Sequence, residues 1–208
     1  MDNAVAWPGG SPAAKVLLVG LGNPGAGYAA TRHNAGFVVV EALAERWGVR
    51  FTQKRFQGAF AEGALCGRPA LWLLPQTFMN RSGQAVGPAA GFYKLAPSAV
   101  VVVHDELEIP FGRLRLKQGG GHGGHNGLRS IDGALPSKDT FRVRVGIGRP
   151  AQGDVSSYVL APFSAEERTW LPEVVDAACD AVESLLREGL AAAQNRAHPL
   201  ELVPAAPR

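Results

Sequence analysis

Polar side chains of the kind that activate water follow several apolar stretches of this sequence. Asn23, His33 and Asn34 lie in and after the Gly/Pro-rich loop that begins at Gly20, and Asp105 comes just after a run of consecutive valines. A histidine whose ring is oriented by a carboxylate can take a proton from water and so act as a general base. His33 and Asp105 are therefore the candidate base and its orienting partner.

Three further polar residues follow other apolar stretches. Asn80 comes after one of them, and His125 and Asn126 close the glycine run GGGHGGHNG. An asparagine amide both donates and accepts hydrogen bonds, so it suits holding a carbonyl group and a water molecule without neutralising the base. No serine stands in a G-x-S-x-G elbow, and Cys66 lies in a strand-like stretch, so water is the expected nucleophile. The chemistry indicated is hydrolysis of an ester or amide.

The loop GLGNPG at residues 20–25 also has the glycine spacing of a dinucleotide-binding motif. That motif requires its third glycine to open a helix whose N-terminus holds a pyrophosphate. Here a proline precedes the third glycine, and the helical pattern begins only near Ala35. The loop therefore favours a site around Asn23 and His33 over a nicotinamide or flavin site.

His122 and His125 could bind a metal ion, although zinc normally takes a third ligand at comparable spacing and none is evident. The glycines around them could instead offer backbone amides to an anion. We expect no metal and no other cofactor. An isolated asparagine in a Gly/Pro loop is often only a turn former, whereas Asp105 at the end of a buried strand would be desolvated unless it had a partner.

Basic residues alternate with apolar ones in two stretches. In RLRLK, a strand would place Arg113, Arg115 and Lys117 on one face, and RVRVG aligns Arg142 with Arg144 in the same way. These residues form either a solvated sheet face or a track for phosphates. The formal net charge of +3 permits an anionic partner without requiring one.

Length and composition indicate one domain. The chain has 208 residues, of which 46% are hydrophobic and 19% charged, and no apolar run approaches the roughly 18 residues of a membrane-spanning helix. The two cysteines, Cys66 and Cys179, show no C-x-x-C spacing, and the N-terminus lacks the features of a secretory signal, which fits the cytoplasm. We expect a domain over 15–197 between flexible tails at 1–14 and 198–208.

Alternating strand and helix patterns predict the α/β class, with a single domain whose twisted mixed β-sheet is flanked by helices on both faces. Gly67 joins the halves of a predicted hairpin. A capping box of Ser164 with Glu167 predicts a helix start, and Pro172 predicts either a break after it or the first turn of a new helix. The other expected strands are 15–20, 99–103, 113–117 and 142–148, and the expected helices are 37–47, a segment ending near 95, 127–135 and 173–187.

Taken together, the motifs resemble those of bacterial peptidyl-tRNA hydrolases, from about Val16 through the C-terminal helix. The matching segments are GLGNPG, TRHNAGF, TFMNRSG, HDEL, GGHNGL, RVGIGRP and YVLAPF. Their order and spacing are specific to that family. The resemblance implies a monomeric, metal-independent α/β hydrolase that cleaves the ester between a peptide and the 3′ ribose of peptidyl-tRNA, recycling tRNA from prematurely released chains.

The resemblance also implies a role for individual residues. By position, His33 matches the family's catalytic base and Asp105 its orienting carboxylate. Asn23 and Asn126 match residues that hold the substrate carbonyl and water, and Asn80 matches one that positions the peptide or the base. The remaining matches are Tyr28, Met79 and His125 as substrate-lining residues, and Lys117 and Arg144 as a pair that binds the tRNA 5′ phosphate. An RNA-binding relative without catalysis is the alternative, and the intact His33 and Asp105 argue against it.

Overall fold

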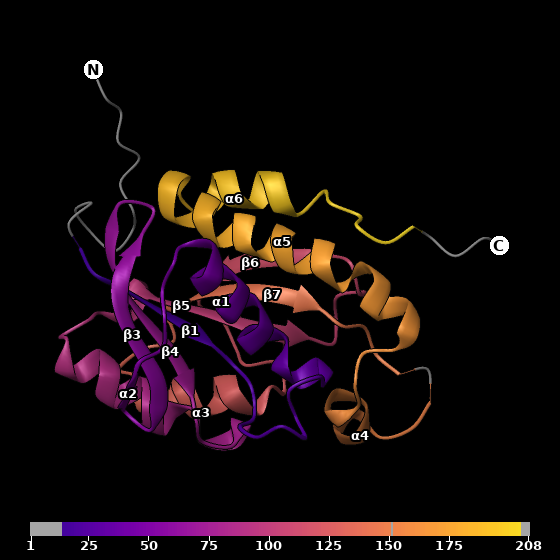
Figure 1. Ribbon diagram of the computed structural model, residues 1–208, viewed down its shortest axis with the longest axis horizontal. Coiled ribbons are helices and arrows are strands. Elements are labelled where there is room, and N and C mark those ends of the chain that lie inside the picture. Colours follow the sequence, from indigo (N-terminus) through magenta and orange to yellow (C-terminus); the bar gives the residue numbers. More distant parts are fainter. Residues whose placement is uncertain (1–13, 151, 205–208) are drawn as a thin grey trace.

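The computed structural model describes residues 14–150 and 152–204, in which seven strands form one sheet of order β2-β3-β4-β1-β5-β7-β6 (Figure 1). Strands β4, β1, β5 and β7 are parallel, whereas β2, β3 and β6 pair antiparallel with their neighbours. The predicted mixed sheet is therefore confirmed. The strands are β1 (Val16–Gly20), β2 (Gln53–Arg55), β3 (Gly58–Leu65), β4 (Arg68–Pro75), β5 (Val100–Glu106), β6 (Leu114–Gln118) and β7 (Phe141–Gly146).

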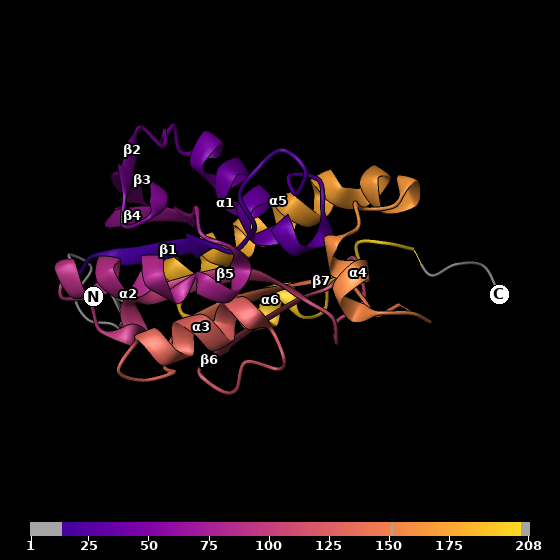
Figure 2. The same cartoon turned by 90° about the horizontal axis from the view of Figure 1, so that it is seen from below.

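Helices cover both faces of the sheet, as predicted. On one face lie α1 (Ala35–Arg46) and α5 (Ala165–Glu188), with α6 (Leu190–Ala197) packed against α5 and the edge strand β6. On the other face lie α2 (Gly83–Phe92) and α3 (Asn126–Ala134) (Figure 2). The short helix α4 (Val155–Leu160) stands beyond the carboxyl ends of the parallel strands (Figure 1). Short 3₁₀ turns are η1 (Arg32–Asn34), η2 (Met79–Arg81) and η3 (Pro97–Ala99).

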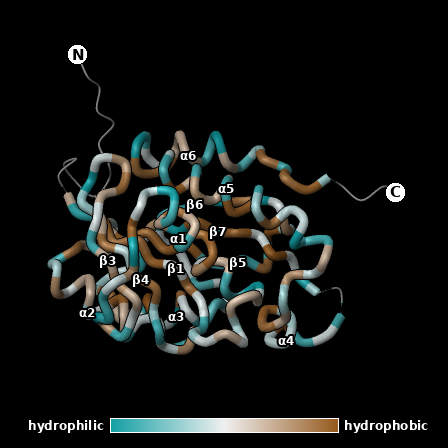
Figure 3. The backbone as a smooth tube through the Cα atoms, viewed as in Figure 1, coloured by the Kyte–Doolittle hydropathy of each residue, from teal (hydrophilic) through white to brown (hydrophobic). Residues whose placement is uncertain are grey.

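Strand alternation divides the core into two layers. In β5, Val101 and Val103 pack with residues of α1 and α5, whereas Val100 and Val102 pack with residues of α2 and α3. The strand is thus buried on both faces, as its consecutive valines predict. Figure 3 shows the hydrophobic residues concentrated in the central strands.

Two local predictions are confirmed and one is wrong. The hairpin around Gly67 forms from β3 and β4, and Ser164 and Glu167 form the capping box that begins α5. Neither the break nor the new first turn predicted at Pro172 occurs, because α5 continues through this residue. Pro172 and Arg168 are both exposed, so water can hydrate the Arg168 carbonyl that loses its helical partner. The buried turns that follow then hold the helix in place.

The predicted tails are only partly described. Residues 1–13 and 205–208 lie outside the described residues. The first part of the C-terminal segment lies against β6, where His198 Nε2 accepts the Leu116 N–H at 2.9 Å. The Leu202 N–H donates to the Gly112 carbonyl at 3.0 Å. Within the described ranges, no helix is both long and apolar enough to cross a bilayer.

Gly36 lies in the first turn of α1, where the helix crosses the ends of β1 and β5. A Cβ atom there would lie 2.3 Å from the Val103 carbonyl oxygen and 2.5 Å from the Leu21 amide nitrogen. We expect Gly36→Ala to lower the free energy of unfolding, measured by urea denaturation, by about 1–3 kcal/mol or more. Gly133→Ala in α3 is the matched control, because its Cβ would meet nothing within 4 Å. That change should raise stability by up to about 1 kcal/mol, and equal effects of the two changes would contradict this account.

Candidate active site

The carboxyl ends of the central strands open onto a cavity of about 540 Å³. Six of the polar residues singled out in the sequence line it, although they come from five separate segments of the chain. They are Asn23, His33, Asn80, Asp105, His125 and Asn126. Helix α4 supplies an apolar wall through Val155, Val159 and Leu160. The fold therefore brings the predicted polar groups together beside a surface suited to apolar groups.

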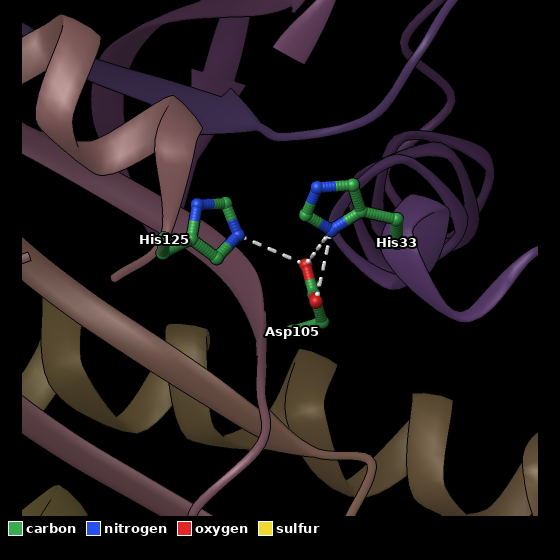
Figure 4. A group of neighbouring side chains, drawn as sticks. All are labelled: His33, Asp105 and His125. Carbon is green, nitrogen blue, oxygen red and sulfur yellow. Dashed lines mark hydrogen bonds and ion pairs between the residues drawn. The ribbon is translucent and has the colours of Figure 1, made fainter. Parts of the chain in front are cut away.

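His33 and Asp105 form the pair predicted from the sequence. His33 Nδ1 lies 3.0 Å from each carboxylate oxygen of Asp105 (Figure 4). Burial raises the pKa of Asp105, but its contacts with His125 and His33 more than offset this and hold the pKa well below its ordinary range. Because an ionised carboxylate can only accept, His33 Nδ1 carries the proton and donates it. His33 Nε2 is thereby left with a lone pair.

His125 is the second donor to the same carboxylate. Its Nε2 lies 3.0 Å from Asp105 Oδ1. Its Nδ1 accepts the backbone N–H groups of Gly127 and Leu128, at 3.1 and 3.4 Å, and so caps α3. A nitrogen that accepts these bonds has no proton, so Nε2 carries it and donates to Asp105. Both nitrogens of His125 are engaged, whereas His33 Nε2 has no hydrogen-bond partner in the described part of the chain.

The three side chains also have the residue types of a metal site. His33, Asp105 and His125 place their possible ligand atoms within 4.8 Å of one another. This is not the His122–His125 pair considered from the sequence, since His122 Nδ1 accepts the Gly124 N–H at 3.1 Å. For His125 to bind a metal through Nε2, its proton would have to move to Nδ1 and break the cap of α3. The donor set therefore fits a hydrogen-bonded network better than a metal ion.

Asn23 is held by a neighbour to which the sequence assigned no role. The Asn23 N–H donates to Asn34 Oδ1 at 2.9 Å, and Asn34 Nδ2 donates to the Asn23 carbonyl at 3.0 Å. Asn23 Oδ1 also accepts the Met79 N–H at 2.8 Å. The Asn23 amide NH₂ is left to donate into the cavity. The only sequence signal for Asn34 was its place next to His33.

The remaining predicted lining residues differ in their placement. Asn80 and Asn126 are exposed on the cavity wall, whereas Met79 lines the cavity with a side chain that is largely buried. Tyr28 is set back from the wall and packs edge-to-face on Phe78, with ring centroids 6.4 Å apart. Phe78 itself lines the cavity and is 55% exposed, so it is a lining residue that the sequence analysis missed.

The predicted basic face exists at the β6–β7 edge. Lys117 lies opposite Arg142 and Arg115 opposite Arg144, so the four side chains share one face. Arg144 Nε donates to Glu106 Oε2 at 2.9 Å. Lys117 makes no ion pair with any residue in the described ranges, and burial together with Arg142 and Arg144 lowers its pKa.

The other predicted members of this face are already occupied. Arg142 is fully buried, donating to Asp132 Oδ1 at 2.9 Å and to the Gly121 carbonyl at 2.7 Å. Arg113 and Arg115 both contact the C-terminal segment. Since Arg144 pairs with Glu106, Lys117 is the one basic residue of this face whose side chain makes no hydrogen bond or ion pair with the described residues.

Comparisons with known proteins point to one family. The family model described as peptidyl-tRNA hydrolase matches residues 17–204. The chain is 54% identical over 184 residues to a peptidyl-tRNA hydrolase of Nocardia farcinica, covering 88% of this chain and 95% of the relative. It is 52% identical over 179 residues to one of a Geobacter species, covering 86% and 95%. The crystal structure of peptidyl-tRNA hydrolase from Acinetobacter baumannii matches with a TM-score of 0.85 at 42% identity, covering 90% of this chain and 96% of that one.

The pH dependence of stability should report on His104, which is 1% exposed. Burial and then His125 lower the pKa of His104 well below its ordinary range, with Asp105 opposing them. Such a histidine binds fewer protons folded than unfolded, so its contribution to stability is lost as the pH falls below about 6.5. Urea denaturation at about pH 7.5 and at about pH 5.5 gives the decrease in unfolding free energy between the two pH values. We expect this decrease to be smaller in His104→Phe than in the wild type by roughly 1 kcal/mol. Identical losses in the two proteins would contradict this.

Proposed function

The chain belongs to the peptidyl-tRNA hydrolase family and is a hydrolase, and from that premise we propose that it cleaves the ester between the peptide and the 3′ ribose of peptidyl-tRNA. Its role would be to recycle tRNA from prematurely released chains. The observation that carries the proposal is the His33–Asp105 pair on the cavity wall, with His33 Nε2 free to act as a base. We also propose that the protein is a cytoplasmic monomer that needs no cofactor. A monomer is supported because one chain lines the whole cavity, and the hydrogen bonds of His125 favour a site without a metal.

The proposed mechanism uses water as the nucleophile. His33 Nε2 takes a proton from a water molecule while the oxygen of that water attacks the carbonyl carbon of the ester. Asp105 stabilises the imidazolium that results. When the ester C–O bond breaks, His33 returns this proton to the ribose oxygen. Asn23 and Asn126 hold the carbonyl and the water, and Asn80 positions the peptide.

The surroundings of the pair suit the two halves of this substrate. The apolar wall of α4 and the exposed ring of Phe78 offer contact to the peptide. Met79 and His125 also line the cavity, and Tyr28 packs against Phe78 behind it. Lys117 and Arg144 offer positive charge to a phosphate, a contact that positions a nucleic acid without reading its bases.

Replacing the base should stop hydrolysis without preventing tRNA binding. We expect His33→Ala to lower the rate about 10²- to 10⁴-fold, measured as peptide release from peptidyl-tRNA with a chelator present. Filter binding should show unchanged affinity for tRNA, because the cations are untouched. His122→Ala, which removes a histidine that lies outside the Asp105 network, is the control and should keep the wild-type rate. Retention of more than about a tenth of that rate by His33→Ala would exclude His33 as the base.

The cationic pair should matter for tRNA but not for the ester itself. We expect Lys117→Gln with Arg144→Gln to raise KM for peptidyl-tRNA and to flatten its salt dependence, because each phosphate contact releases counterions. A peptide esterified to a short 3′ fragment without the acceptor stem should be hydrolysed as before. The measurement is a salt series on both substrates.

The matched control for this pair is Arg113→Gln. Arg113 is a cation of the same edge whose partner is Glu201, so its removal should leave the salt dependence unchanged. If the double variant hydrolyses the two substrates equally poorly, the cations support the fold or the chemistry and the phosphate contact is wrong.

A further inference from the structure

His104 is a buried titratable side chain beside the site that has no part in the mechanism above. We propose that His104 is a positioning residue that supports the ring of His125 and the main chain of Asp105. The inference deepens the proposed function and rests on it, because both supported groups surround the carboxylate that orients the base.

The Asp105 carbonyl needs a donor from His104 because strand β1 ends too early to supply one. The Val103 carbonyl accepts the Leu21 N–H at 3.0 Å, and the last residue pair between β1 and β5 joins Gly20 to Val103. Two residues further on, the Asp105 carbonyl points to the same side, where β1 has already ended. His104 Nδ1 lies 2.6 Å from this carbonyl oxygen. A carbonyl can only accept, so His104 Nδ1 carries the proton and donates it. This bond replaces the one that a backbone N–H of β1 would make if that strand were longer.

The alternation of side chains explains the contact with His125. Val102 packs in the layer of α2 and α3, so His104, two residues later, lies on that face. Asp105 lies on the opposite face, and His125 reaches it from the N-terminus of α3. The rings of His104 and His125 pack edge-to-face, with centroids 4.9 Å apart and an angle of 75° between their planes. His104 therefore supports the ring of His125, which extends from the face of the sheet that carries α3 to Asp105 on the opposite face.

Burying a histidine at position 104 costs free energy of folding, so we expect its imidazole to make an interaction that an apolar ring could not make. With the proton on Nδ1, Nε2 has none, and this buried atom finds no hydrogen-bond partner in the part of the chain that is described. Burying an unpaired acceptor costs free energy that a phenyl ring would not cost. What the imidazole adds is the bond from Nδ1 to Asp105. Because burial keeps His104 neutral, it adds no charge that would compete for the Asp105 carboxylate.

Two substitutions separate the two contacts. His104→Phe keeps a ring against His125 and removes the Nδ1 donor, whereas His104→Asn keeps a donor near the position of Nδ1 and removes the ring. We expect each to lower kcat about tenfold or more, with KM for peptidyl-tRNA within about twofold, since His104 does not line the cavity. Circular dichroism would establish that both variants fold. A wild-type kcat in both would overturn the proposal.

A double-mutant cycle tests whether the effect passes through His125. In a His125→Ala background, His104→Asn should cause little further loss of kcat, because the supported ring is already absent. Val102→Ala is the control, since it thins the same face of β5 and should reduce stability without coupling to His125. Additive losses for His104→Asn would overturn the proposal, because they would show an effect independent of His125.

Nitrogen-15 NMR of the histidine rings gives a readout that needs no substrate. In the wild type, His125 should show an unprotonated Nδ1 and a protonated Nε2, and His104→Asn should shift these signals toward a mixture of tautomers. An unchanged His125 tautomer in this variant would overturn the proposal. If the protein failed to hydrolyse peptidyl-tRNA but the NMR shift appeared, the proposed function would be wrong and the positioning role would stand.

Discussion

The site depends on one buried negative charge. The Asp105 side chain is almost completely buried, and such a charge is tolerated only when donors surround it. His33 and His125 supply them, and each must hold its proton on the nitrogen that faces Asp105. His125 meets this condition because its other nitrogen is occupied by the first turn of α3. The end of β5, the turn η1 and the start of α3 are thus fixed relative to one another by a single ionised group.

Much of the frame around this charge could be predicted from residue patterns. The run of valines placed β5 at the centre of the sheet, and the Gly67 turn gave the hairpin. The Gly/Pro-rich break after β1 marked where that strand ends, and this loop carries Asn23 and His33 to the cavity. Such features are predictable because they arise from local backbone preferences and from a two-residue period, both of which a short stretch of sequence carries. Asp105 reaches the cavity from inside β5, which continues to Glu106, beyond the end predicted at 103.

What could not be predicted depends on packing between distant segments. Alternation placed Arg142 correctly on the same face as Arg144, but no pattern shows that this face lies beside Lys117 or that Asp132 of α3 pairs with Arg142. The tautomer of His125 depends on two backbone amides whose direction is known only when the helix is built. Pro172 was misjudged because the cost of a proline depends on whether water reaches the carbonyl it frees, which is a property of the folded surface.

The segment after α6 has a consequence for association between molecules. Strand β6 is at the edge of the sheet, and an edge strand with free backbone groups is a template for pairing with a second chain. Here Gln194 Nε2 donates to the Leu116 carbonyl, His198 Nε2 accepts the Leu116 N–H, and the Leu202 N–H bonds to the Gly112 carbonyl. Side-chain and backbone groups of α6 and of the segment after it thus occupy backbone groups of β6, and of Gly112 just before it, that a neighbouring strand would otherwise bond. Because these backbone groups are already bonded, they are not available to pair with a strand of a second molecule.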